Sequence, residues 1–526
     1  MKKIVTGSEF FLCIVGGGIS ALLAVLCFVL RAHLINTEEY AVYLRNGPLF
    51  LLSFLIVLLL LVLVKKPLLH IKSRTLFLLF CGIFLIAALY LNLRIPEGLK
   101  GDAFMINKHA RLFHEGNFEG LTKGYYLHYF PYQLGMVAWE DFLLRFSASN
   151  RPIFVMNAVF ALLANFFQWR IYRNLFAVPE GEDSLGEKYT ILFSFAFLPL
   201  LFFTRFAYGC LPGLMLAEGG VHFLLCSIRK RRASLAAVSV LLFTLSYIMK
   251  LNYLILCIAV SLILLLLFFQ EKKKSFLLLA ILILFCAQAG LQLTYLTYRQ
   301  LSGVPFGAGA PASLNTAMGL MPEEEGSGRR GGWYNGYNFD TFGKVDFNEE
   351  KASTVAREKI QELIAYWRTH PKKAVLFFAD KVVSSWCDPL YESVWIGPLT
   401  DEGNRIEDPA LDSLYSGDHA YRFVEGWMNV LIVLLEGGAA LFYLGGIARK
   451  KKRPLTTCIP ALYLIGGFLY LLIGEANSQY TFMYVYFLIP CAVRGMADAG
   501  LHKAVRRICS GSVCTVFRRN RSSAAK

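Results

Sequence analysis

The sequence predicts an all-α polytopic membrane protein, and three observations carry this prediction. Hydrophobic residues make up 56% of the 526 residues and charged residues only 17%, whereas soluble domains are about a quarter charged. Apolar runs of about 20 residues, the length of a membrane-spanning helix, recur along most of the chain. The formal net charge is +16, but its cations gather in short segments between apolar runs, as membrane orientation requires. The basic balance therefore points to a lipid bilayer and not to nucleic acid.

About twelve apolar segments are predicted to cross the bilayer. In chain order they cover residues 10–30, 49–64, 76–93, 153–172, 189–203, 214–228, 235–249, 253–269, 276–296, 427–444, 457–473 and 482–493. Basic clusters follow the second segment at Lys65 and Lys66 and the sixth at residues 229–232. Since positive loops stay in the cytoplasm, we expect a multi-pass protein of the cell membrane with both termini cytoplasmic.

The apolar segment 130–146 decides the topology. If it crossed the membrane, the basic runs at residues 229–232 and 271–274 would both face outward, against the positive-inside bias. The segment also carries Glu140, and a carboxylate is costly inside hydrocarbon. We therefore predict that it lies in the outer interface, as a helix of the large outer loop that covers residues 94–150.

This threading divides the chain into five regions. The segment between the ninth and the tenth predicted spans has no long apolar run. It is rich in Gly, Asn, Trp, Asp and Glu, so it is predicted to be a mixed outer domain. The regions are an N-terminal two-span hairpin (1–74), a transmembrane core (75–296), an extracytoplasmic domain (297–426), three C-terminal spans (427–497) and a basic cytoplasmic tail (498–526).

No metal site or cofactor is predicted. Most of the twelve cysteines lie inside apolar runs, where they behave as small hydrophobes, and no CxxC pair occurs, which argues against a zinc site or a disulfide framework. Three histidines of the first outer loop, His109, His114 and His128, lack metal-ligand spacing beside acids.

Polar groups gather on the predicted outer side. Asp102 comes a few residues after the third span, and a carboxylate at a membrane boundary is costly unless it is paired or used. The other groups lie at the ends of later spans and are Arg205, Lys250, Asn252, Glu475, Gln479 and Tyr480.

An acid and several cations beside lipid fit glycosyl transfer from a lipid phosphate. The carboxylate takes a proton from the attacking hydroxyl, and the cations hold the phosphate and stabilise its charge as it leaves. Simpler roles remain open: Asp102 can cap the helix that follows it, Arg205 and Lys250 can be interface anchors, and the tyrosines near residue 126 can form an aromatic belt.

Several motifs occur in an order that resembles a known family. They are the loop Asp102…Ala110…Gly116-Asn117-Phe118, then Tyr-Phe-Pro-Tyr-Gln-Leu-Gly at 129–135, Ala-Met-Gly-Leu at 317–320, Gly-Trp-Tyr-Asn-Gly-Tyr at 332–337, Lys381…Trp-Cys-Asp-Pro at 386–389…Glu392, and Glu-Ala-Asn-Ser-Gln-Tyr at 475–480. From about residue 75 onward the chain resembles GT-C fold membrane glycosyltransferases. The closest likeness is to bacterial relatives of the protein O-mannosyltransferases and of the lipid A aminoarabinose transferase, of the glycosyltransferase family 39 type.

The resemblance implies a polyprenyl-phosphate-linked sugar as donor, Asp102 as general base and an interfacial helix after the first outer loop. Two positions depart from the family pattern. Relatives often carry a second acid where this chain has Cys210, which puts a two-carboxylate or metal-assisted mechanism in doubt. Relatives often carry Arg where this chain has Gln479, which leaves more of the phosphate binding to Lys250 and Arg205.

The sequence thus predicts an inverting membrane glycosyltransferase that moves a sugar from a polyprenyl-phosphate donor to a glycan, lipid or protein acceptor on the outer face. Asp102 is the predicted base, and Lys250 and Arg205 are the predicted phosphate ligands. Predicted substrate contacts are Glu475, Gln479, Tyr480, His109, Tyr126, Asn252, Trp333 and Glu392.

Two other functions are alternatives. A lipid-linked glycan flippase or transporter requires charged or broken spans near the membrane midplane, and we expect few ionisable groups there. An inactive scaffold for envelope assembly is consistent with Cys210 and Gln479.

Overall fold

The computed structural model describes residues 2–35, 40–323, 329–400, 403–451 and 453–500. Helices take up 76% of the chain, which confirms the all-α class. Within the described residues the one sheet is an antiparallel hairpin of β1 (Leu30–Ile35) and β2 (Tyr40–Arg45), which lies largely between the first two predicted spans. The backbone amide of Ala32 donates to the carbonyl of Cys387 at 2.8 Å, so this hairpin fastens the N-terminal helix to a distant part of the chain.

In the described part of the chain nine helices are long and apolar enough to cross a membrane, as expected of a multi-pass membrane protein. Each matches a predicted span. They are α1 (Lys2–Val29), α2 (Pro48–Leu63) continued by α3 (Lys65–His70), α4 (Ser73–Arg94), α8 (Arg151–Leu175), α11 (Cys210–Lys230), α13 (Leu254–Glu271), α14 (Lys274–Ser302), α20 (His419–Ala448) and α21 (Ile459–Ile473), the last preceded by η5 (Leu455–Cys458).

The other three predicted spans form shorter or bent helices. The fifth is α9 (Leu185–Ala196) followed by α10 (Pro199–Phe202) and η3 (Phe203–Arg205), with a bend of 48° between the two parts. Pro199 starts the second part because proline cannot continue the hydrogen-bond ladder of a helix. The seventh is α12 (Ala233–Met249) and the twelfth is α22 (Phe482–Asp498), each of 17 residues. The count of twelve crossings therefore stays a prediction.

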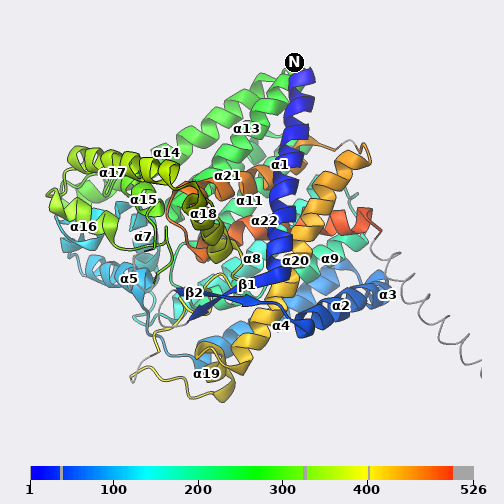
Figure 1. Cartoon of the computed structure of the whole chain (residues 1–526), viewed down its shortest axis with the longest axis horizontal. Helices are drawn as coiled ribbons and strands as arrows, with labels where there is room; N and C mark the ends of the chain where they lie inside the picture. The colour runs from blue at the N-terminus through cyan, green and yellow to red at the C-terminus, as the bar shows by residue number, and fades with distance from the viewer. Residues whose placement is uncertain (1, 36–39, 324–328, 401–402, 452, 501–526) are drawn as a thin grey trace, which may run out of the picture.

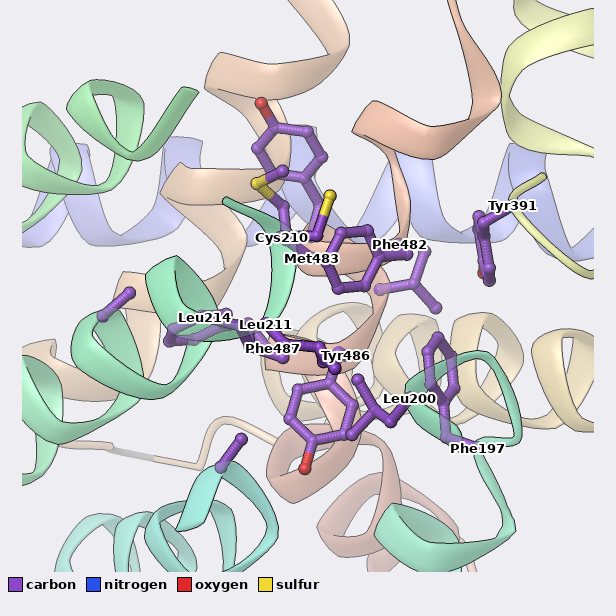
Figure 2. Packing of buried hydrophobic residues seen from close by; sticks show 14 of the residues in the cluster. Phe197, Leu200, Cys210, Leu211, Leu214, Tyr391, Phe482, Met483, Tyr486 and Phe487 are labelled. Atoms are coloured by element: carbon purple, nitrogen blue, oxygen red, sulfur yellow. The ribbon is translucent and has the colours of Figure 1, made fainter. Parts of the chain in front are cut away.

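The spans pack around α22, which is buried along almost its whole length. Figure 2 shows Phe482, Met483 and Phe487 of this helix in one cluster with Leu211 and Leu214 of α11. At the edge of the bundle, α1 lies along α20 (Figure 1). A Cβ on Gly17 would lie 2.8 Å from Cγ of Leu444, so the small residue permits this close helix contact.

The predicted first outer loop contains short helices only. These are α5 (Gly101–His114), η1 (Glu119–Leu121), α6 (Tyr126–Tyr129), η2 (Pro131–Gln133) and α7 (Leu134–Leu144). The 11 residues of α7 rise about 16 Å, well short of a hydrocarbon core of about 30 Å. This length agrees with the prediction that segment 130–146 does not cross.

In the predicted outer domain (297–426) the described regular elements are helices joined by long loops. Its helices are α15 (Ala312–Gly319), α16 (Tyr337–Lys344), α17 (Glu349–Thr369), α18 (Pro371–Trp386) and α19 (Pro409–Tyr415), and α15 to α17 gather at one side of the molecule in Figure 1. The helix α14 continues to Ser302 and α20 already begins at His419, so both helices extend a few residues into the predicted range of this domain. Most of the predicted basic tail, residues 501–526, lies outside the described residues.

Candidate functional site

A cavity of about 330 Å³ opens where α5, α6 and the hinge between α21 and α22 meet the outer domain. Its volume falls in the range of small-molecule sites. Its walls combine charged, amide and aromatic side chains. The lining includes Lys100, Asp102, Arg329 and Glu475; Asn315, Asn338, Asn477 and Gln479; and Tyr126, Phe130, Tyr132, Phe206, Tyr208, Tyr334, Trp395 and Tyr480. Five predicted site residues therefore meet here: Asp102, Tyr126, Glu475, Gln479 and Tyr480.

Asp102 lies in the first turn of α5 and faces the cavity. Lys100 is the N-cap residue of this helix and no side chain caps it, so the carboxylate is not used as a helix cap. The Tyr126 hydroxyl instead donates to Asp102 Oδ1 at 3.0 Å. The exposed part of this side chain opens into the cavity. The surrounding protein atoms desolvate the carboxylate and so raise the pKa of Asp102. The hydrogen bond from Tyr126 and the positive charge of Lys250 act in the opposite direction and lower this pKa.

Lys250 supplies positive charge behind the cavity wall. It is buried at the end of α12, and its Nζ lies 4.2 Å from the ring centroid of Tyr208 and 5.2 Å from that of Tyr480. Both rings line the cavity, and a cation over a tyrosine face is held by the ring quadrupole. The loop before α11 fits closely here, because a Cβ on Gly209 would lie 2.1 Å from the carbonyl oxygen of Met249.

The hinge between α21 and α22 forms another wall. It contains the short turn η6 (Ser478–Tyr480), which Asn477 caps by accepting from the Gln479 amide at 2.8 Å. The Tyr480 hydroxyl donates to Glu475 Oε1 at 3.4 Å. Gln479 lines the cavity, and its side-chain oxygen Oε1 is buried and has no hydrogen-bond partner among the described residues.

Lys381 of α18 holds this hinge from behind. Its buried Nζ lies within hydrogen-bond distance of three carbonyl oxygens, those of Gly319, Leu472 and Gly474, and donates to all three when it is protonated. Burial lowers its pKa to about 7. The lysine therefore joins the end of α15 and the end of α21 at one point.

Trp333 and Glu392, which the sequence predicts as substrate contacts, do not line the cavity. Trp333 Nε1 donates to the Ser384 hydroxyl at 3.0 Å, and its backbone pairs with Ala476 of the hinge. Glu392 Oε1 accepts from the Ser478 hydroxyl at 3.0 Å. Both residues contact the hinge or its support, so they position the cavity wall.

Arg205, which the sequence predicts as a phosphate ligand, lies away from the cavity. Its guanidinium is fully buried, donates to Asn92 Oδ1 at 2.9 Å and to the Pro96 carbonyl, and lies 3.7 Å from the ring centroid of Phe154. Asn92 and Pro96 lie at and just beyond the end of α4, and Arg205 does not line the cavity. The hydrogen bonds from its two terminal nitrogens hold the segment of chain that leads to Asp102.

His109 and Asn252 lie outside the cavity lining as well. The buried ring of His109 stacks on Tyr126, with centroids 6.0 Å apart and 11° between the planes. Burial lowers the pKa of His109 to about 4, so a neutral imidazole supports Tyr126 from its far side. Asn252 is half-buried in η4 (Leu251–Tyr253).

Two cations of the cavity are absent from the sequence prediction. Lys100 lies two residues before Asp102, with its Nζ 4.4 Å from the ring centroid of Trp395, and its nearness to the acid is a signal that the sequence offers. Arg329 donates to the Tyr334 carbonyl at 2.5 Å. It comes from a loop more than 200 residues away in the chain, and no local pattern marks it.

Ionisable residues also lie inside the spanning helices, contrary to the expectation for those segments. Glu218 and His222 are buried in α11 and Glu436 in α20. Neither carboxylate oxygen of Glu218 has a hydrogen-bond partner in the part of the chain that the structure describes. All three residues fall within predicted spans, so the sequence alone was sufficient to find them.

Among the described residues no group of three or more His, Cys, Asp or Glu side chains is arranged to hold a metal ion. Cys210, where relatives of the resembled family often carry an acid, is buried beside Lys250 and does not line the cavity. No protein-family model and no curated protein matches the chain.

Proposed function

We propose that the protein is a membrane glycosyltransferase that uses a polyprenyl-phosphate-linked sugar as donor, with the cavity at Asp102 as its active site. The observation that carries the proposal is the Asp102 carboxylate, which opens into a cavity of about 330 Å³ with Lys100 and Arg329 in its lining and Lys250 behind its wall. A proton acceptor and cations beside one aqueous space, next to apolar helices, match a substrate that is half lipid and half sugar.

The proposed reaction moves the sugar in one displacement with inversion. The acceptor hydroxyl oxygen forms a bond to the anomeric carbon while the bond from that carbon to the phosphate oxygen breaks. The electron pair of the broken bond goes to the phosphate, and polyprenyl phosphate leaves. Asp102 takes the hydroxyl proton; because Tyr126 engages Oδ1, we assign Oδ2 this role.

The cations have the task of stabilising the leaving phosphate. Since Arg205 donates its hydrogen bonds to residues at the end of α4, we assign this task to Lys250 together with Arg329 and Lys100. We assign the sugar and acceptor contacts to the hinge, where Glu475, Gln479 and Asn477 line the cavity. The extracytoplasmic placement of the cavity and the cytoplasmic placement of both termini belong to the same proposal.

The test is transfer of labelled sugar from undecaprenyl-phosphate hexoses to endogenous acceptors in vesicles that contain the protein. Loss of a general base costs about 100-fold or more in rate, so Asp102→Asn is expected to reduce transfer by that factor. Glu115→Gln is the matched control, because Glu115 is an exposed acid at the other end of α5. Full transfer by Asp102→Asn removes the proposal.

A lipid-linked glycan flippase or transporter is the second candidate, and one observation favours it. Glu218 and Glu436 are buried within spanning helices, where ionisable residues commonly serve transport. The same vesicles separate the two functions: movement of the labelled lipid across the bilayer without sugar transfer favours the transporter. An inactive scaffold produces neither signal.

A further inference from the structure

A second hollow lies at the opposite end of α12 from Lys250. It has a volume of about 810 Å³ and lies between α12 and α14, near the turns that join α11 to α12 and α13 to α14. The 17 residues of α12 rise about 26 Å, so this groove and the Asp102 cavity lie near opposite membrane surfaces.

Small side chains on α12 create the groove. Ala233, Ala236 and Ala237 are spaced three and four residues apart and line it together with Val240, since such spacing puts side chains on one helix face. The facing wall comes from α14 and includes Leu278, which is 57% exposed. The groove is therefore apolar and opens to the lipid side of the bundle.

The length of the groove corresponds to one membrane leaflet. Its lining on α12 runs from Ala233 to Thr244, a rise of about 16 Å. The hydrocarbon core is about 30 Å thick, so the groove reaches from the membrane surface to the midplane, as an acyl chain does.

Two arginines line the mouth of the groove, and the one acid among the residues that line it, Glu271, pairs with Lys273. Arg231 and Arg232 line the mouth and are exposed, and neither makes an ion pair within the described residues. Their neighbours differ: Lys230 pairs with Glu180, and Lys273 pairs with Glu271. A guanidinium pair matches the oxygens of a phosphate.

We propose that this groove binds an anionic phospholipid, with its phosphate on Arg231 and Arg232 and one acyl chain between α12 and α14. The occupant follows from the combination of an apolar trough of leaflet length with an unpaired cationic mouth. The site lies in the leaflet opposite the Asp102 cavity and is independent of the proposed sugar transfer.

Native mass spectrometry of the full-length protein in detergent tests the site. The protein is titrated with phosphatidylglycerol and with phosphatidylcholine of the same acyl chains. Near a membrane surface each Lys or Arg contributes about 1 kcal/mol toward an anionic lipid, so phosphatidylglycerol is expected to bind about 5-fold or more tightly. Equal affinity for the two lipids overturns the proposal.

Two pairs of variants locate the binding. Arg231→Asn with Arg232→Gln is expected to remove the preference for phosphatidylglycerol; Asn suits position 231 because its φ is 53°. Arg229→Gln with Lys230→Gln removes the same charge from residues that do not line the groove and is expected to keep the preference. An equal loss in both double variants means that only overall charge is sensed and overturns the site.

The groove itself has a separate test. Ala237→Phe fills it and is expected to weaken binding of both lipids at least 5-fold, whereas Val238→Phe adds bulk on α12 outside the lining and is expected to leave binding unchanged. Unchanged binding in Ala237→Phe overturns the proposal even where the arginine variants fail to fold. Displacement of the lipid by millimolar inorganic phosphate also overturns it, because a bare ion site then explains the binding.

Discussion

Asp102 and Tyr126 form a polar contact in the lining of the cavity. Burial raises the pKa of Asp102, and the Tyr126 hydrogen bond to Oδ1 and the Lys250 charge oppose that rise. The carboxylate is thus ionised only above its shifted pKa, and a base-catalysed rate must fall as the pH drops through that value.

The Tyr126→Phe variant tests this coupling. Loss of a hydrogen bond to the ionised carboxylate raises the pKa of Asp102 further, so the acid limb of the pH–rate profile is expected to move to higher pH, with the rate at acidic pH several-fold below wild type. Tyr125→Phe removes an exposed hydroxyl beside it and is the control. A profile that shifts to lower pH, or does not shift, contradicts the role of Tyr126.

Loss of Lys381 should weaken the contact between α15 and the end of α21. Each of its three carbonyl acceptors loses a buried donor in Lys381→Met, at about 1 kcal/mol or more apiece. We expect the free energy of unfolding to fall by roughly 3 kcal/mol, measured by thermal unfolding in detergent. Lys372→Met, at an exposed position of the same helix, should unfold like wild type.

The stability difference between wild type and Lys381→Met is expected to depend on pH. The reason is the pKa of Lys381, which is about 7 in the folded protein and 10.5 ordinarily. Between these values the unfolded chain holds a proton that the folded chain has released. The stability contributed by Lys381 therefore increases with pH, by up to about 1.4 kcal/mol per unit. The difference between wild type and Lys381→Met is expected to be larger at pH 9 than at pH 7, and a smaller difference at pH 9 contradicts the assignment.

At the scale of elements, α15 and the hinge after α21 meet without side chains between them. A Cβ on Gly319 would lie 2.2 Å from both the carbonyl carbon and the oxygen of Gly474 and 2.7 Å from the Glu475 amide nitrogen. These are backbone atoms, which cannot give way as a flexible side chain can. Contact between the two elements therefore depends on a glycine at position 319.

Gly319→Ala is expected to push the hinge, and with it Glu475, away from its place in the cavity. Overpacking of this kind costs about 1–3 kcal/mol, and we expect a lower melting temperature together with at least 10-fold slower sugar transfer, which about 1.4 kcal/mol of barrier suffices to produce. Gly426→Ala in α20 meets nothing within 4 Å and should be neutral or slightly stabilising. Equal behaviour of the two variants would show that the close approach is unimportant.

Elements were predictable where the pattern is local. Spans such as 76–93 and 153–172 match α4 and α8 within a few residues, because about 20 apolar residues identify a spanning helix without further context. The hairpin of β1 and β2 was missed because it is short and is held by a contact to Cys387. The place of Arg205 was missed because charge alone does not say which way a buried side chain turns.

At the scale of the whole molecule, the cavity joins parts of the chain that are far apart in sequence. Asp102, Arg329 and Glu475 line one space, although more than 140 residues separate each from the next. The sequence placed Asp102 and Glu475 together through the predicted membrane topology, since both follow spans that are predicted to run outward. Arg329 lies in a polar domain without such a constraint, so its contribution required the fold.

Three exposed positions report the direction in which the chain crosses the membrane. Glu115 follows α5, Arg229 ends α11 and Glu350 begins α17. Between the first two lie α8, the bent α9–α10 pair and α11, and between the last two lie α12, α13 and α14. If each of these six crosses, both intervals hold three crossings, and position 229 faces the opposite side from 115 and 350.

The test introduces one cysteine at a time at these positions. Sealed cells are treated with a membrane-impermeant maleimide, and the labelled position is identified from peptide masses. Background is expected to be low, because the ten described cysteines are buried or half-buried, and wild type is the control. We expect Glu115→Cys and Glu350→Cys to react from outside and Arg229→Cys only after permeabilisation.

Labelling of 115 and 229 from the same side would make the bent α9–α10 pair re-entrant. Labelling of 229 and 350 from the same side would instead mean that the 17-residue α12 does not cross, and labelling of 115 from the cytoplasm alone would remove the extracytoplasmic cavity and with it the proposed enzyme.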